Sequence, residues 1–225
     1  MGKKVLLTML VLFLLLCAAA GGLFLYRPTT VDAQRQTSEA ELLELLESGQ
    51  TVIKDFSPPA VEGEELEFGE LESSASDPVD ETAPMEITGY GVIYIPAIDL
   101  KMPLVEGADS YSLRAAAGWL PTSAEMGRAG NCVIFGHRMQ TYGRHFNRLG
   151  EVQVGDEIKL YSMDETCYTY TVTGTETISP NVLMDTLGSH NEGFCLTLVT
   201  CTPTGVGSHR LLVYAELNQS SQQEE

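Results

Sequence analysis

Short runs of alternating hydrophobic and polar residues fill the second half of the chain, from about residue 89 to residue 218. Such alternation is typical of β-strands that bury one face, and the runs are enriched in β-branched and aromatic residues. Pro96 and Pro103 are expected to break the first run into two strands, because proline cannot donate a hydrogen bond to a strand ladder. The expected strands cover residues 91–107, 131–137, 156–162, 167–178, 194–201 and 209–217.

Helical patterns between these strands are short. Residues 110–117 are expected to form a helix, because Ser110 can cap its N-terminus and the segment is rich in alanine. Further short helices are expected around residues 143–149 and 181–187. Many short strands with few helices predict a mainly β domain, a closed or nearly closed β-barrel with short accessory helices.

Residues 1–27 differ from the rest of the chain. Lys3 and Lys4 precede an unbroken apolar run over residues 5–26, long enough to cross about 30 Å of hydrocarbon as one transmembrane helix. A cleaved signal peptide is the alternative, with alanines 18–20 near a cleavage site, but the apolar run continues beyond them and favours a retained anchor. The lysines before the span predict a single-pass protein of the cell membrane, with a cytoplasmic N-terminus and an extracellular domain.

Residues 28–88 are rich in glutamate and interrupted by prolines, and Lys54 is the only basic residue between residues 37 and 86. A short amphipathic helix is expected at residues 39–47. The composition otherwise predicts a solvated, largely disordered acidic stalk. The expected layout is therefore a tip and membrane anchor at 1–27, a stalk at 28–88, a folded domain at 89–218 and a polar tail at 219–225.

Length and charge limit what the domain can do. The chain has 225 residues, of which 44% are hydrophobic, enough for one sizeable domain with appendages. The formal net charge of -18 repels nucleic-acid phosphates and anionic lipid head groups. No nucleic-acid partner is therefore expected.

Four cysteines lie in the folded domain, and in an extracellular compartment the plain interpretation is two disulfides among Cys132, Cys167, Cys195 and Cys201. That interpretation leaves the surroundings of Cys201 unexplained. The strand of Cys201 runs directly into a Thr-Pro pair, a position that is expected to lift the side chain out of the ladder.

Cys201 also has candidate chemical partners. Arg210 follows nine positions later, across a glycine-containing loop that can return the chain as an antiparallel neighbour. His137 ends a different strand, and folding can bring it to the same place. A thiolate attacks a carbonyl carbon, an imidazolium protonates a departing amine, and a guanidinium stabilises or positions an oxyanion. The three residues therefore form a candidate catalytic site.

The flanking sequences resemble the signature of sortases, the membrane-anchored cysteine transpeptidases of Gram-positive bacteria. The resemblance rests on TLVTC at residues 197–201, HR at residues 209–210 and GHR at residues 136–138, and it extends over residues 90–217. It implies a closed eight-stranded β-barrel. By motif position it implies that Cys201 is the nucleophile, His137 the general acid and base, Arg210 the group that holds substrate or oxyanion, and Thr200 a secondary contributor to oxyanion or substrate support.

The resemblance also implies a two-step acyl transfer. The enzyme cleaves an LPXTG-type sorting signal of a surface protein or pilin through a thioester on Cys201. An amine then accepts the acyl group, either a cell-wall peptide of a peptidoglycan precursor or a pilin lysine. No metal and no organic cofactor are expected.

Two subclasses share features with this sequence. TCTPTGVGSHRLLV at residues 200–213 resembles the pilin-polymerising class C, whose members usually carry an N-terminal lid with an Asp-Pro-aromatic motif and often a second membrane helix. Here Val79 replaces the aromatic residue after Asp77 and Pro78, and the C-terminus is polar. A single N-terminal anchor is closer to class D.

Several residues have plainer interpretations. His209 is expected to be structural, because strand alternation points it away from the face of Arg210. His145 and His190 are expected at the surface. A disulfide between Cys132 and Cys195 is a hypothesis, with two free thiols as the alternative. The competing function is a non-catalytic anchored interaction module in which Cys201 is structural.

Overall fold

The computed structural model describes residues 30–56, 84–109, 112–139, 143 and 145–218, and the statements below concern those residues. The predicted membrane segment and the Asp77-Pro78-Val79 sequence lie outside them. Within the described ranges, no helix combines the length and the apolar character needed to cross a membrane.

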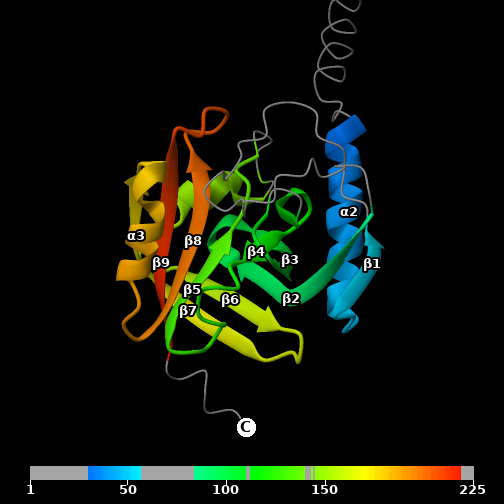
Figure 1. The fold of residues 1–225 in the computed structure, drawn as a ribbon, viewed down its shortest axis with the longest axis horizontal. Helices are drawn as coiled ribbons and strands as arrows, with labels where there is room; N and C mark the ends of the chain where they lie inside the picture. The colour runs from blue at the N-terminus through cyan, green and yellow to red at the C-terminus, as the bar shows by residue number, and fades with distance from the viewer. Residues whose placement is uncertain (1–29, 57–83, 110–111, 140–142, 144, 219–225) are drawn as a thin grey trace, which may run out of the picture.

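Eight strands form one closed barrel (Figure 1). Around the barrel the order is β2-β3-β4-β5-β8-β9-β7-β6, and pairing of β2 with β6 closes the circle. The eight-stranded mainly β fold is therefore confirmed. The strands are β2 (Met85–Ile95), β3 (Leu100–Glu106), β4 (Ala117–Trp119), β5 (Gly130–Phe135), β6 (Glu157–Ser162), β7 (Cys167–Ile178), β8 (Phe194–Thr202) and β9 (His209–Leu217).

The barrel interior is filled by aliphatic side chains from alternate positions of every long strand. Ile93, Ile134, Leu160, Leu198 and Val213 are all fully buried there. Because side chains alternate across a strand, the residues between them point outward. The outward face of β5, β8 and β9 is covered by a second apolar cluster, to which the helix α3 (Leu183–Ser189) contributes two leucines.

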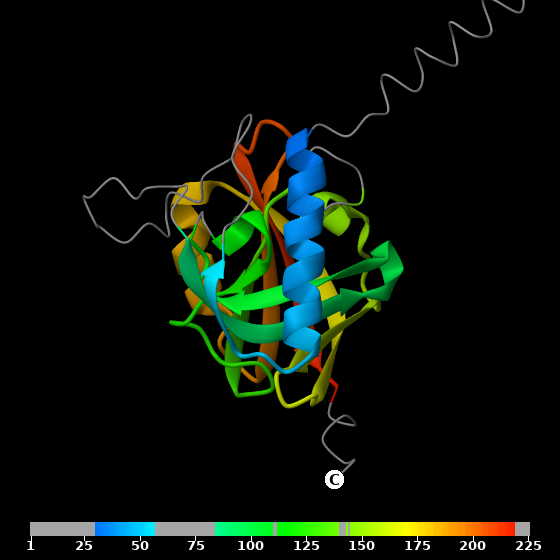
Figure 2. The ribbon, with the colours of Figure 1, turned by 90° about the vertical axis from the view of Figure 1, so that its right-hand side faces the viewer.

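The helix α2 (Thr30–Glu47) and the strand β1 (Val52–Phe56) pack on the other side of the barrel (Figures 1 and 2). Leu42 and Leu46 are buried in a third cluster with Ile53 of β1 and Val105 of β3. β1 also pairs antiparallel with the start of β2. The amphipathic helix expected at residues 39–47 lies within α2. The solvated stalk predicted around it is wrong for residues 37–56, because the leucines of this helix bury an apolar stripe against the barrel.

The helix predicted at residues 110–117 is also wrong in its described part. Ser112–Arg114 form a single turn of 3₁₀-helix, and Ala117–Trp119 form β4. Ala115 and Ala116 are fully buried in the cluster beneath α2. The alanines therefore allow close packing between layers, and helix propensity does not decide the structure.

The other short elements follow the sequence more closely. A 3₁₀-helix at Phe146–Glu151 occupies the expected helical region, and a 3₁₀ turn at Pro180–Val182 leads into α3. Pro96 starts a 3₁₀ turn between β2 and β3, as predicted. The break predicted at Pro103 is wrong, because Pro103 lies inside β3, where the ladder to β4 begins only at the next residue.

The closing seam of the barrel depends on a glycine. Gly91 of β2 has a φ of +150, and a Cβ there would lie 2.0 Å from the main-chain oxygen of Tyr161 on β6. We expect Gly91→Ala to lower the free energy of unfolding by roughly 1–3 kcal/mol or more, because β6 must move away from β2. Urea denaturation measures the change.

Gly174→Ala in β7 is the matched control, because a Cβ at that strand glycine meets nothing within 4 Å. Equal unfolding free energies for the two variants would show that the seam tolerates a side chain at residue 91.

Candidate active site

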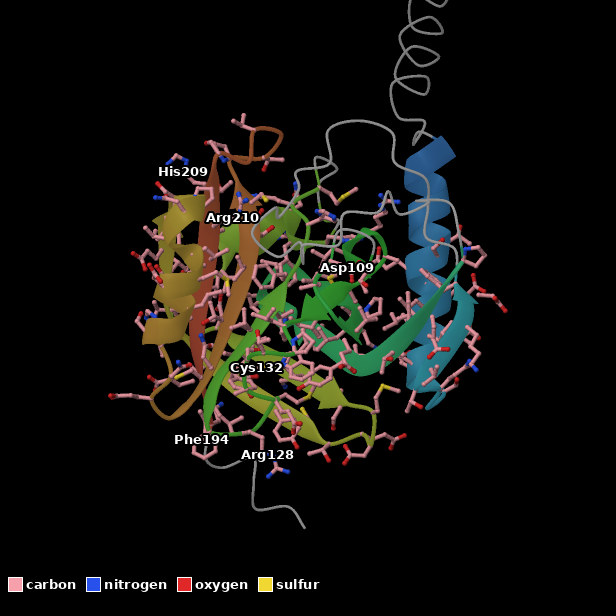
Figure 3. All side chains as sticks on the ribbon, in the orientation of Figure 1. Asp109, Arg128, Cys132, Phe194, His209 and Arg210 are labelled. Carbon is pink, nitrogen blue, oxygen red and sulfur yellow. The ribbon has the colours of Figure 1, made fainter. Side chains whose placement is uncertain are left out.

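Antiparallel pairing of β8 with β9 sets Cys201 opposite Arg210. The pair lies near the end of β8 and the start of β9, and Figure 3 shows Arg210 and His209 at one end of the barrel, away from Phe194 at the start of β8. Directly opposed residues on neighbouring strands point to the same face. The predicted proximity of Cys201 and Arg210 is therefore present in the fold.

His137 reaches the same place from β5, which pairs with β8 in parallel. The register aligns Phe135 with Val199, and the amide of Gly136 donates a hydrogen bond of 3.0 Å to the carbonyl of Val199. Continued for two residues, that register sets His137 beside Cys201. Phe135, Val199 and Cys201 all belong to the cluster on the outer face, so alternation places His137 on that face too.

The three side chains are almost completely withdrawn from solvent. Cys201, His137 and Arg210 expose 1%, 5% and 4% of their surface. Arg210 Nη1 donates hydrogen bonds to the carbonyls of Gly207 at 2.9 Å and His209 at 3.3 Å, which hold the guanidinium in place. A buried cation and a buried imidazole beside a thiol act more strongly on one another than they would in water.

Thr200, next to the predicted nucleophile, points to the opposite face of β8. Its hydroxyl donates a buried hydrogen bond of 2.7 Å to the carbonyl of Gly136. This bond ties β8 to the residue that precedes His137. The contact favours a role for Thr200 in positioning His137, while direct support of an oxyanion stays a prediction.

Arg138 is a further cation at the site, and its role was not predicted from the sequence. Its Nη1 donates a hydrogen bond of 2.8 Å to Thr202 Oγ1, at the end of β8. Burial lowers the pKa of the Arg138 guanidinium, and the negative charge of a Cys201 thiolate nearby partly opposes that shift. The sequence feature that could have indicated a role for Arg138 is its place in the GHR sequence, directly after His137.

The exposure of the other three histidines agrees with the sequence-based expectation for His209 but not for His145. His209 is exposed while Arg210 is buried, as strand alternation predicts. His190 is half-buried and stacks on Tyr214, with ring centroids 4.2 Å apart. His145 was expected at the surface, but only 1% of it is exposed, and its ring lies against Glu39 of α2.

Cys132 and Cys195 are both free thiols, so the hypothesis of a disulfide between them is wrong. In the parallel register Cys132 aligns with Leu196, and Cys195 aligns with Asn131. The two sulfur atoms therefore point to opposite faces of the sheet. Burial raises the pKa of both thiols. Over the described ranges, no three His, Cys, Asp or Glu side chains gather as metal ligands would.

Comparison with known proteins places these residues in context. A family model described as a sortase domain matches residues 93–218, more than half of the chain. Sortase A of Listeria monocytogenes is 28% identical over 130 residues, which are 58% of this chain and 57% of that relative. Sortase D of Bacillus subtilis is 30% identical over 131 residues, 56% of this chain and 62% of that relative.

A solved structure gives the same result. The crystal structure of Streptococcus agalactiae sortase C1 in complex with MTSET matches with a TM-score of 0.52 and 29% identity. The match covers 57% of this chain and 66% of that one. The chain thus spans between about half and two thirds of the length of these relatives, whose names carry three different class letters.

The bond from Thr200 to Gly136 generates a test of how His137 is held. Thr200→Val leaves the Gly136 carbonyl buried without this donor, so the end of β5 shifts and His137 moves away from Cys201. We expect carbamidomethylation of Cys201 to slow roughly tenfold, the effect of losing about 1.4 kcal/mol of thiolate stabilisation. Peptide mapping by mass spectrometry follows the modification of Cys201 alone.

Thr197→Val is the matched control. Thr197 is also buried in β8, and its hydroxyl donates a 2.8 Å hydrogen bond to Asn131 Oδ1 in the interior of β5. This variant loses a comparable bond without touching the site, so Cys201 should react at the wild-type rate. Equal slowing in both variants would contradict a specific role for Thr200.

Proposed function

The chain belongs to the sortase family, and we propose that it is a membrane-anchored cysteine transpeptidase that cleaves an LPXTG-type sorting signal and transfers the acyl part to an amine. The observation that supports this proposal most is the convergence of Cys201, His137 and Arg210 on one face at one end of the barrel. Their chemistry matches the three needs of acyl transfer from a peptide bond.

In the proposed first step, the Cys201 thiolate attacks the carbonyl carbon of the threonine in the sorting signal. A carbon–sulfur bond forms, and the carbonyl oxygen becomes an oxyanion that Arg210 stabilises. The carbon–nitrogen bond then breaks, and the His137 imidazolium gives its proton to the departing amine. The acyl group remains on Cys201 as a thioester.

In the second step an amine attacks the thioester carbon. The neutral His137 imidazole accepts the proton of the incoming amine, the carbon–sulfur bond breaks, and the Cys201 thiolate returns with the His137 imidazolium. The cycle consumes no electrons and leaves both catalytic groups as they began. No cofactor therefore enters the proposed reaction.

The proposed acceptors are a cell-wall peptide of a peptidoglycan precursor and a lysine of a pilin subunit. A pilin acceptor is supported by the likeness of residues 200–213 to class C sortases and by the match to sortase C1 of Streptococcus agalactiae. The matches also include sortases A and D, so they do not select the pilin lysine over the cell-wall peptide. The rates of transpeptidation to a cell-wall peptide and to a pilin lysine peptide, measured under the same conditions, decide between the two acceptors.

We also propose an extracellular catalytic domain held at the cell membrane by residues 5–26. The support is the apolar run itself, preceded by Lys3 and Lys4. Because residues 37–56 pack on the barrel, the domain would lie close to its anchor.

The direct test incubates the full-length chain with an LPXTG peptide and measures the intact mass of the protein. We expect an acyl adduct in the wild type and, when an amine is added, a transpeptidation product. Cys201→Ala should form neither. Arg210→Lys should lower kcat at least about a hundredfold, the scale reported for losing one oxyanion donor.

Cys195→Ala is the matched control, since it removes a partly exposed thiol at the opposite end of β8. It should form the adduct like the wild type. An adduct that survives Cys201→Ala, or no adduct with any sorting peptide, would contradict the proposal; the second result would favour a non-catalytic anchored module.

A further inference from the structure

His145 has a backbone conformation that a residue with a side chain rarely adopts. Its φ is 45 and its ψ is -137, and its side chain is fully withdrawn from solvent. Strained positions of this kind persist only where surrounding contacts hold them, and they gather at functional sites. The proposed reaction uses His137 and leaves His145 without a role.

The contact that holds the His145 ring comes from a distant part of the chain. His145 Nε2 lies 3.5 Å from Glu39 Oε2, and the Glu39 side chain is only 13% exposed. Among the described residues, neither ring nitrogen of His145 has a hydrogen-bond partner. The Glu39 carboxylate is therefore the charged group that lies closest to hand to orient this imidazole.

Glu39 itself sits on a fixed support. It is carried by α2, whose Leu42 and Leu46 are buried against the barrel with Val105 of β3. Near the end of the helix, Glu47 forms an ion pair with Lys101 of the same strand. The helix thus holds the Glu39 carboxylate at a defined position beside the His145 ring.

A short series of contacts leads from His145 to His137. The backbones of His145 and Arg138 form a β-bridge, and the amide of Phe146 donates a 3.0 Å hydrogen bond to the carbonyl of His137. The Phe146 ring packs so tightly on Gly136 that a Cβ there would lie 2.6 Å from the ring. Gly136 and Arg138 flank His137 and are both in contact with this segment. A displacement of His145 therefore shifts the backbone on both sides of His137.

We propose that Glu39 and His145 are positioning residues for His137, so that α2 forms part of the active-site framework. The Glu39 carboxylate keeps the His145 ring in its buried place, and the bridge from His145 to Arg138 and the bond from Phe146 then hold His137 beside Cys201. This inference depends on the proposed transpeptidase function only in the test that measures turnover of a sorting peptide. Since His137 acts on the departing amine, loss of the contact should lower kcat and leave KM unchanged.

The test compares Glu39→Gln with Glu41→Gln in the full-length chain. Both changes remove one negative charge from α2, but Glu41 is exposed to solvent. We expect kcat for the sorting peptide to fall roughly tenfold in Glu39→Gln, which corresponds to about 1.4 kcal/mol, and to stay at the wild-type value in Glu41→Gln. The double variant with His145→Gln should be no slower than the slower single variant.

A second readout does not require turnover of any peptide. Carbamidomethylation of Cys201 reports whether His137 still lies beside the thiol, and it should slow in Glu39→Gln but not in Glu41→Gln. If the wild type turns over no sorting peptide, the proposed function fails while this ratio still decides the role of Glu39. Equal alkylation rates, or a change in KM without a change in kcat, would overturn the proposal.

Discussion

Parallel pairing between β5 and β8 is the interaction on which the site depends, because it brings together two residues from distant parts of the chain. Its register aligns Phe135 with Val199, and the next residues carry His137 to the side of Cys201. β9 then returns antiparallel and adds Arg210 opposite the cysteine. A slip of one residue in either ladder would turn one partner to the other face of the sheet. The chemistry is therefore a consequence of register, which the apolar filling of the barrel enforces.

Because Cys201, His137 and Arg210 are buried, further contacts are needed to hold them in position. Polar side chains removed from water act strongly on one another, and small displacements change their interaction. Thr200 ties β8 to Gly136, and Arg138 ties the segment after His137 to Thr202. These two bonds hold the residues before and after His137 against β8. The contact between Glu39 and His145 adds a third support from α2. Residues distant from the reacting atoms thereby determine how well the site is arranged.

Much of the barrel could be predicted from alternation, because a strand that buries one face shows this pattern directly, as in residues 167–178. The failures arose where tertiary packing overrides local preference: Ala115 and Ala116 pack beneath a helix, and the stalk leucines bury themselves on a barrel that the local sequence does not reveal. Cys201, His137 and Arg210 were recognisable because they stand in motifs. His145 was missed because neither its positive φ nor its distant partner Glu39 leaves a local signal.

The central claim is that one face of β5, β8 and β9 carries out acyl transfer. The most direct measurement is a crystal structure of the chain after reaction with a sorting-signal analogue that carries an electrophilic ketone in place of the scissile amide. The predicted result is a carbon–sulfur bond to Cys201 on the outer face, with the oxygen of the adduct toward Arg210 and the leaving-group side toward His137. A label on Cys167 or Cys195, or an oxygen that points away from Arg210, would contradict it.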